Sequence, residues 1–293
     1  MFIRILVKTG VLCAGRAQMT GLVIGLQLVG IAAAQSERPV DRIQDNSFLV
    51  EEAYNQETGI VQHIGTGFFQ HQRRPGADEE RLELAFSQEW PVYGQKHQLS
   101  YTIPAVFTWR HGAEESGLGD AMVHYRWQAW FDPDTLTALA PRASVILPTG
   151  NAARGLGEDT VGAQFNLPFS TTLNPRWFVH ANAGTTLLPD AASANGRALH
   201  HAHLGGSAIY ALTHDLHLML EWVGSWIESE RAGGGTRHEW VSLISPGLRK
   251  AFDFRGDVQL VLGVAAPLGL TRASPDFGVF LYASLEHPFR SIR

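Results

Sequence analysis

Cysteine, lysine and long apolar runs are all scarce in this 293-residue chain. The one cysteine, Cys13, lies near the N-terminus, so the rest of the chain can form neither a disulfide nor a cysteine–metal site. Lysine occurs only at positions 8, 96 and 250, and the chain has no basic cluster, which argues against nucleic acid as a partner. No uncharged apolar run reaches the length of about 18 residues that a membrane-spanning helix requires.

The N-terminus has the three parts of a secretory signal. Positive charge comes first, from Arg4, Lys8 and Arg16. An apolar core at 21–31 and the small residues Ala32-Ala33-Ala34 follow, so we predict a signal peptide over 1–34. The apolar core is too short to favour the alternative, a membrane anchor, and Gly10-Val11-Leu12 before Cys13 is a poor lipoprotein signal. Translation could start at Met1 or at Met19.

The chain contains 30 glycines and 15 phenylalanines, a mixture that is typical of β-rich proteins. Apolar and polar residues alternate with a period of two through much of it, as they do in half-buried strands. In 215–227, one face carries Leu216, Leu218, Leu220, Trp222 and Trp226. The other face carries Asp215, His217, Glu221 and Ser225.

Twelve such segments are predicted as strands, and most have ten residues or more. Soluble sheets use strands of about five or six residues, whereas about 9–11 residues are needed to cross a bilayer obliquely. The segments are 59–70, 81–90, 97–110, 119–131, 140–149, 158–169, 175–188, 199–212, 215–227, 237–251, 256–267 and 277–289.

The connections between these segments alternate in length, with 132–139 as the weakest example. The long, polar ones are 71–80, 111–118, 150–157, 189–198, 228–236 and 268–276, and the tighter ones are 91–96, 132–139, 170–174, 213–214 and 252–255. Long loops on one side and short turns on the other are the pattern of outer-membrane barrels. An even number of strands would then place both termini on the short-turn side, in the periplasm.

A closed sheet explains the alternation because every backbone N–H and C=O in hydrocarbon needs a partner within the protein. A soluble β-sandwich also alternates, but the long strands, the loop pattern and the tryptophans on the apolar face favour a membrane barrel. We therefore predict an all-β fold, a transmembrane antiparallel β-barrel of about 12 strands. The barrel would span 59–293, preceded by a short periplasmic or plug segment at 35–58.

Several charged and imidazole side chains are placed toward the lumen by the same alternation. The predicted lining residues are Asp120, His124, Arg126, Arg142, His180, His201, His203, Glu221 and Arg249. Both charge signs occur, so a strong filter for one ion is not indicated. Inward apolar residues such as Met122 and Met219 make the lining mixed, which suits small aromatic or amphiphilic solutes better than bare ions.

The chain contains 13 histidines, which raises the question of a metal site. His201 and His203 share a face, and hairpin pairing places His203 opposite Gly184, but no third ligand converges. We predict no metal and no cofactor. A barrel lipid hydrolase is an alternative that would need a Ser–His pair on the lipid-facing rim, and the serines that can be placed face the lumen instead. We therefore predict no enzymatic activity.

The stretch 43–64, IQDNSFLVEEAYNQETGIVQHI, does not follow the strand period. Capping residues before Phe48 predict about two helical turns over 48–56, ended by Gly59. We expect this segment to lie in or across the periplasmic opening, with its acids on luminal arginines and Tyr54 against the wall. A solvated tether is the alternative. The predicted plug residues are Asp45, Glu51, Glu52, Tyr54, Asn55, Gln56 and Glu57.

Four stretches together resemble the family of outer-membrane transporters that is associated with phenol-degradation (meta-pathway) genes. They are 43–64, QEWPVYGQKHQLSYTIP at 88–104, GLGDAMVHYRWQ at 117–128 and ILPTG at 146–150. The resemblance implies an outer-membrane barrel and passage of small organic compounds. It supplies no catalytic residues.

We accordingly predict a bacterial outer-membrane channel for small organic molecules, aromatic or amphiphilic ones included. A non-conducting structural barrel is the main alternative, because narrow barrels often fill their lumens with side chains. The expected partners are outer-membrane lipid, a small-molecule solute and the barrel-assembly machinery during insertion. The sequence sets no oligomeric state.

Overall fold

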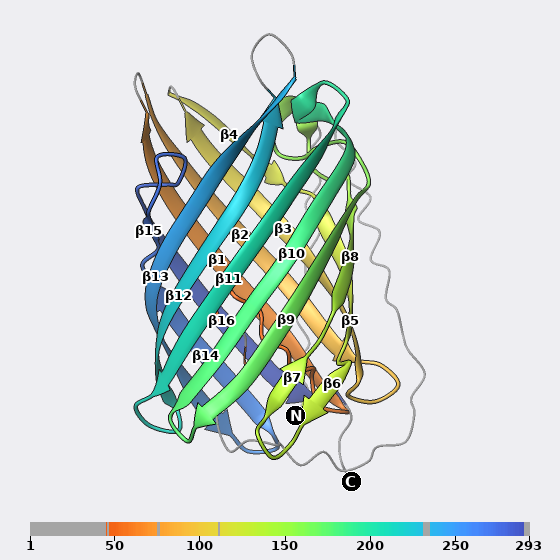
Figure 1. Ribbon diagram of the computed structural model, residues 1–293, viewed down its shortest axis with the longest axis vertical. Coiled ribbons are helices and arrows are strands. Elements are labelled where there is room, and N and C mark those ends of the chain that lie inside the picture. Colours follow the sequence, from red (N-terminus) through yellow and green to blue (C-terminus); the bar gives the residue numbers. More distant parts are fainter. Residues whose placement is uncertain (1–44, 46, 75–76, 111, 231–234, 290–293) are drawn as a thin grey trace, which may run out of the picture. The chain divides into compact units, whose positions relative to one another are not determined.

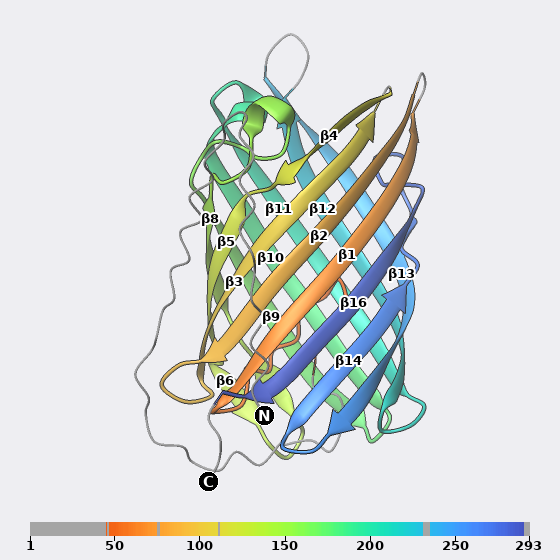
Figure 2. The ribbon, with the colours of Figure 1, turned by 180° about the vertical axis from the view of Figure 1, so that it is seen from behind.

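The computed structural model describes residues 45, 47–74, 77–110, 112–230 and 235–289. The predicted signal peptide lies outside the described residues. Those described form one closed antiparallel barrel, which Figures 1 and 2 show from opposite sides. In the described part of the chain, no helix is long and apolar enough to cross a membrane.

Sixteen strand segments make up the wall, and they combine into the 12 strands that the sequence predicts. Three of the 12 are broken into shorter segments, namely β4 to β6, β7 with β8, and β14 with β15. The segments are β1 Ile60–Arg74, β2 Ala77–Pro91, β3 His97–Arg110, β4 Ala113–Leu118, β5 Ala121–Trp127, β6 Trp130–Asp132, β7 Thr137–Leu139, β8 Arg142–Leu147, β9 Gly162–Asn174, β10 Trp177–Ala191, β11 Arg197–Ala211, β12 Leu216–Glu230, β13 Thr236–Phe254, β14 Val258–Ala265, β15 Leu268–Gly269 and β16 Phe277–Pro288. Two short 3-10 helices, η1 Ala152–Arg154 and η2 Ala192–Ala194, lie in connections.

The first and last strands close the barrel. β1 pairs with β16 from Ile60↔Pro288 to His71↔Phe277, and its other edge pairs with β2. Closure matters because an open edge in hydrocarbon would leave a row of backbone groups without partners. The predicted fold class is therefore confirmed.

Burial along the strands separates a barrel from a soluble sandwich. On β12, Leu218 and Leu220 are 44% and 50% exposed, while Glu221 between two outward residues is fully buried. A water-soluble protein would reverse this order, with the apolar side chains inside. Outward leucines and inward acids are what a wall between lipid and lumen requires.

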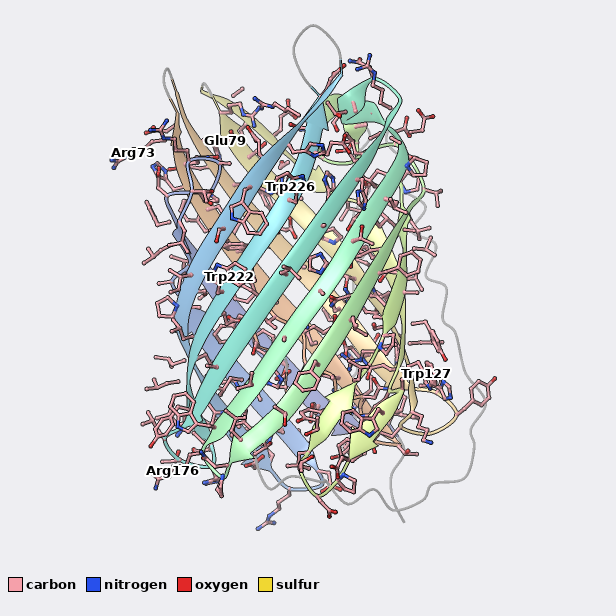
Figure 3. The ribbon with its side chains drawn as sticks, in the orientation of Figure 1. Arg73, Glu79, Trp127, Arg176, Trp222 and Trp226 are labelled. Carbon is pink, nitrogen blue, oxygen red and sulfur yellow. The ribbon has the colours of Figure 1, made fainter. Side chains whose placement is uncertain are left out.

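Aromatic side chains mark the outer surface at different heights. In Figure 3, Trp222 and Trp226 point away from β12. Trp127 lies toward the end of the barrel where β1 begins and β16 ends. Trp222, Trp226 and Trp240 form a cluster. The ring centroid of Trp240 lies 6.5 Å from that of Trp222 and 6.2 Å from that of Trp226. Tryptophan favours the membrane–water boundary because one edge of its ring is polar.

The predicted long connections at 150–157, 189–198 and 268–276 are mostly irregular, as predicted, whereas strands occupy much of the other three. β1 continues to Arg74 and β2 begins at Ala77, β4 occupies 113–118, and β12 and β13 shorten the connection predicted at 228–236. Beyond the bilayer both faces of a hairpin meet water. Apolar and polar residues therefore stop alternating along the sequence, although the hydrogen bonds between the strands continue. Conversely, β6 and β7 shorten the doubtful turn at 132–139.

The N-terminal segment, defined as residues 45 and 47–59, is not helical, and the predicted helix over 48–56 was wrong. Its conformation is irregular, with bends at Phe48–Val50 and at Ala53. Nine residues are too few for a stable isolated helix. The backbone groups that a helix would pair internally bind side chains of the barrel instead.

Candidate functional site

The N-terminal segment runs through the interior of the barrel before β1 begins, as the orange trace in Figure 2 shows. Its backbone N–H groups are bound by side chains from the wall. Glu221 Oε1 accepts hydrogen bonds from the N–H groups of Leu49, at 2.8 Å, and Val50, at 3.0 Å. One carboxylate thereby fixes two consecutive peptide units.

Further along the segment, three different strands provide acceptors for its N–H groups. Asn182 Oδ1 accepts from Glu51 at 2.7 Å, and Ser170 Oγ accepts from Ala53 at 2.8 Å. Gln98 Oε1 accepts from Gln56 at 2.7 Å. Buried backbone groups need such partners, and each bond contributes about 0.5–1.5 kcal/mol. The luminal side chains therefore define the path of the segment.

Phe48 anchors the segment in a recess of the wall. Its ring lies 5.6 Å from the ring of Phe280 and 5.5 Å from that of Tyr282. The recess exists because two neighbouring wall residues are glycines. A Cβ at Gly263 would lie 2.3 Å from the Phe48 ring, and one at Gly247 would lie 2.9 Å from it.

Glu51 forms the main ion pairs between the segment and the wall. Arg126 Nη1 lies 3.0 Å from its Oε1, and Arg142 Nη1 lies 3.3 Å from its Oε2. Asn166 Nδ2 donates to Oε2 at 2.8 Å. Burial alone would raise the pKa of the Glu51 carboxyl, but Arg142 and Arg126 outweigh it and lower the pKa. Glu51 is therefore ionised at neutral pH.

Besides Glu51, Arg126 binds Glu52, Tyr54 and Asn55 of the segment. Its Nε donates to Asn55 Oδ1 at 2.8 Å, and its Nη2 donates to the Tyr54 carbonyl at 2.5 Å. Its Nη1 also donates to the Glu52 carbonyl at 3.1 Å. The side chain is only 2% exposed. A buried guanidinium with every direction occupied is well suited to fix a peptide that has no secondary structure of its own.

Asp45 lies in a second polar cluster, which involves β1, β13 and β16 instead of the strands that bind Glu51. Its carboxylate accepts from Gln62 Nε2 at 2.9 Å, from Ser284 Oγ at 2.5 Å and from the Tyr282 hydroxyl. Arg249 Nη1 donates to its backbone carbonyl at 2.5 Å. Burial raises the pKa of Asp45, and Arg249 opposes the shift only in part. Burial, with the nearby Asp45 charge, raises the pKa of Glu52 well above its usual range.

Tyr54 packs against the wall near the β6–β7 turn. Its hydroxyl donates to the Leu136 carbonyl at 2.5 Å, and its ring lies edge-on to His180 and Phe131, each at 6.3 Å between centroids. Burial raises the pKa of the Tyr54 hydroxyl, so it remains a proton donor. Gln56 also binds the wall, through Gln62, while Glu57 lies at the tight turn that leads into β1.

The predicted histidines line the interior in hydrogen-bonded pairs. His124 bonds to Ser144 through Nδ1 at 2.8 Å and to Thr102 through Nε2 at 3.0 Å, and His180 Nδ1 bonds to Ser170 at 2.6 Å. His203 lies opposite Gly184, as the hairpin pairing predicts, and its Nε2 bonds to Asn166 at 3.2 Å. His201 Nδ1 accepts the N–H of Glu228 at 3.1 Å. Among the described residues, no group of three or more metal-ligating side chains gathers.

Asp120 has a different place from the one predicted. It lies between β4 and β5 rather than at an inward strand position, and its carboxylate binds backbone N–H groups of the β8–β9 connection. Strand alternation fails there because the strand is broken at Gly119 and Asp120. The site also uses luminal polar residues that the sequence reasoning missed, although inward alternation was a signal for them. They are Gln98, Asn166, Ser170, Asn182 and Ser207.

The fold and the internal segment define an outer-membrane β-barrel whose lumen contains its own N-terminal chain. The family profile described as "Putative MetA-pathway of phenol degradation" matches residues 62–281. The chain belongs to this family, and the resemblance noted from the sequence is confirmed.

Solved structures share the architecture. The COG4313 outer membrane channel from Pseudomonas putida F1 is 13% identical, with a TM-score of 0.60 over 80% of this chain and 97% of that one. The translocator domain of the autotransporter NalP from Neisseria meningitidis is 12% identical, with a TM-score of 0.49 over 80% and 90%. The P. putida toluene transporter TodX is 10% identical, with a TM-score of 0.42 over 81% of each chain. At 13% identity the likeness to the COG4313 channel concerns the fold alone, and the two TM-scores below 0.5 support no argument. No match was found among curated proteins.

Proposed function

We propose that this protein is an outer-membrane channel for small organic solutes, aromatic or amphiphilic ones included, and that its N-terminal segment is the plug. The observation that carries the proposal is the set of wall side chains bonded to the segment backbone, from Glu221 on β12 to Gln98 on β3. A structural barrel needs no such chain inside it, whereas a gated channel needs an obstacle that it can move.

The plug is bound by polar and ionic contacts and by two separate apolar clusters, one around Phe48 and one around Ala53 and Tyr54. Arg126 and Arg142 meet Glu51, and Phe48 is the main aromatic anchor. Hydrogen bonds and ion pairs can be exchanged for bonds to water when the segment leaves, so its release costs less than unfolding the wall. This supports a movable plug over the alternative of a solvated tether.

The mixed lining supports the solute class. Phe68 and Phe280 present aromatic rings, with centroids 5.6 Å apart, on the β1–β16 side. Thr102 and His124 provide hydroxyl and imidazole groups on the β3–β5 side. A solute with a ring and a polar substituent would satisfy both sides, whereas a bare ion would meet apolar surface on one of them.

We infer that both termini face the periplasm and that the predicted plug, which precedes the first strand, lies at the periplasmic half. Support comes from the even strand number and from the export signal predicted at 1–34. We further infer that the barrel does not catalyse lipid hydrolysis. Its closest Ser–His pairs, such as Ser170–His180 at 2.6 Å, are buried in the lumen and not on the lipid-facing surface.

Deletion of 43–56 tests the plug and the channel together in planar bilayers. We expect the deletion to raise the single-channel conductance severalfold, because it empties the lumen between Phe48 and Gln56. Removal of 35–42, which spares these contacts, is the matched control. An equal conductance with and without 43–56 would contradict the plug, and no conductance from either folded protein would contradict the channel.

A further inference from the structure

The Glu51 carboxylate of the N-terminal segment is bound by three side chains from neighbouring wall strands. Arg126 on β5 lies opposite Arg142 on β8, which in turn lies opposite Asn166 on β9. We define these three side chains as the carboxylate cradle. Arg126 contacts Glu51 Oε1, whereas Arg142 and Asn166 contact Oε2. Two guanidinium groups and an amide N–H form a site that suits any planar carboxylate, whether or not it belongs to this chain.

One half of the carboxylate cradle is open to the lumen. The side chains of Arg142 and Glu51 are 20% and 15% exposed, whereas that of Arg126 is 3% exposed. Glu221, which binds the backbone of the same segment, is fully buried. An anion in the lumen can therefore reach Arg142 while the segment is in place, whereas Arg126 becomes accessible only after Glu51 has left.

Arg142 has hydrogen-bonding capacity that Glu51 does not use. Its Nη2 donates to Gln164 Oε1 at 2.8 Å, and its Nη1 faces Glu51. Its Nε is buried and makes no hydrogen bond with the residues that the structure describes. A guanidinium has five N–H donors and binds a carboxylate best through two of them at once. Arg142 can therefore bind a second carboxylate in exchange for Glu51 and keep its bond to Gln164.

The wall beside the carboxylate cradle becomes apolar within four residues. Two residues further along the same strands, His124 and Ser144 bond to each other at 2.8 Å. Two residues further again, Met122 and Ile146 face each other and pack with Leu188. Each step of two residues is about 7 Å along a strand. A solute with its carboxylate in the cradle would therefore lie beside the His124 imidazole and extend toward apolar side chains.

This order of groups along the wall defines a class of solute. The cradle binds one carboxylate. A flat ring attached to that carboxylate would lie against the His124 imidazole, and its far edge would approach the Met122 thioether, both of which are favourable partners for an aromatic ring. A second charge at the far end would be buried against apolar side chains without a partner. The solute that fits is an aromatic monocarboxylate.

We propose that Glu51 occupies the carboxylate cradle as an internal substitute for a solute, and that an aromatic monocarboxylate in the lumen displaces Glu51 and so releases the N-terminal segment. This inference rests on the proposed channel function. The exchange replaces one carboxylate on the arginines by another, so that no buried guanidinium loses its partner. An uncharged aromatic solute cannot make this exchange, because it would leave the Arg126 and Arg142 charges unpaired.

The attachment of Glu51 to the chain sets the concentration at which the exchange occurs. The segment is joined directly to β1, so Glu51 competes at an effective concentration on the order of millimolar. An aromatic monocarboxylate should therefore half-saturate the unaltered protein in roughly the millimolar range. Removal of the Glu51 charge should strengthen binding of the solute. A purely structural ion pair predicts no such gain.

Fluorine NMR on the full chain in detergent micelles measures binding directly. The probe is 4-fluorobenzoate, whose resonance broadens when it is bound. For comparison, 4-fluorobenzyl alcohol has the ring without the charge, and trifluoroacetate has the charge without the ring. Glu51→Gln removes the competing charge, and Arg142→Gln removes the accessible guanidinium. Arg176→Gln, at an exposed arginine between β9 and β10, is the matched control.

We expect 4-fluorobenzoate to bind at least fivefold more tightly to Glu51→Gln than to the unaltered protein, and at least tenfold more weakly to Arg142→Gln. The other two probes should bind the unaltered protein at least tenfold more weakly than 4-fluorobenzoate does. Arg176→Gln should leave binding within twofold. The gain in Glu51→Gln is a result that misfolding cannot produce. Equal binding to the unaltered protein, Glu51→Gln and Arg142→Gln overturns the proposal.

Planar-bilayer recording tests the release of the N-terminal segment. Benzoate at about 10 mM, above the expected effective concentration of Glu51, should raise the open probability severalfold, and benzyl alcohol should not. Binding of 4-fluorobenzoate without any increase in opening by benzoate overturns the release. Higher conductance after deletion of 43–56, in a protein that binds no 4-fluorobenzoate, overturns this inference while the channel function stands. No conductance with or without 43–56, despite binding at the cradle, overturns the channel function instead.

Discussion

The N-terminal segment and the strap, defined as the β8–β9 connection at residues 148–161, are both irregular stretches that contact the barrel wall, but they are fastened differently. The N-terminal segment is bound along its whole length, by residues that include Gln98 on β3, Arg126 on β5 and Glu221 on β12. The strap is bound at two points, Asp120 and η2. The first contains buried ion pairs, and the second depends mainly on backbone N–H groups.

This difference shows that the two irregular stretches are held by separate sets of contacts. Removal of the N-terminal segment would clear the axis, and it requires several bonds from different strands to break together. The strap is held mainly by contacts of Asp120, Thr149 and Glu158. Substitutions that loosen one stretch should leave the other in place, because Asp120 and Thr149 make no contact that the N-terminal segment shares.

The largest effect is expected from Arg126→Ala. Loss of the guanidinium leaves the buried Glu51 carboxylate and the Tyr54 carbonyl without their main partner, which costs about 3–5 kcal/mol. Frequent opening to the conductance of the deletion protein should follow, with faster hydrogen exchange at 49–56. Arg176→Ala removes an exposed arginine that binds the Tyr210 hydroxyl and is the control. Unchanged conductance in Arg126→Ala would show that the contacts of Arg126 do not hold the N-terminal segment in the lumen.

Gly263→Ala should have the next largest effect. The added Cβ would overlap the Phe48 ring, and overpacking of this kind costs about 1–3 kcal/mol. Openings should increase, and the double variant Phe48→Leu/Gly263→Ala should restore part of the closure. Gly206→Ala, where a Cβ meets nothing within 4 Å, should behave as the unaltered protein does. Additive effects of Phe48→Leu and Gly263→Ala would contradict the recess.

The smallest expected effect is the pH dependence of plug binding. The pKa of Glu51 is lowered, so its stabilisation is present above the ordinary value of 4.5 and is lost as the pH falls through the lowered pKa. Burial raises the pKa of Asp45 and Glu52, so these groups favour binding as the pH falls from neutral. Conductance should therefore decrease slightly on mild acidification and rise below about pH 4.5.

Glu51→Gln separates these contributions because it removes only the group with the lowered pKa. Its conductance should lack the rise below about pH 4.5 and keep the decrease above it. A rise in Glu51→Gln at the same pH as in the unaltered protein would assign the acid response to other carboxyls.

The sequence by itself determined the barrel, its number of strands and the side of each strand that faces lipid. These properties depend on a period of two, which is local, and on strand length, which the bilayer sets. Alternation also placed Arg126 and Glu221 inward, where they are buried. It failed at Asp120, because a break in a strand resets the alternation, and beyond the bilayer, where both faces of a hairpin are polar.

Only the tertiary structure decided what the irregular stretches do. The helix predicted over 48–56 does not form, because acceptors from strands that are far apart in sequence replace the bonds within a helix. The Phe48 recess depends on Gly247 and Gly263 meeting across two strands, and the strap depends on Asp120 meeting Gly150 and Glu158. Such pairings follow from the closure of the barrel, and a local pattern of residues carries no record of them.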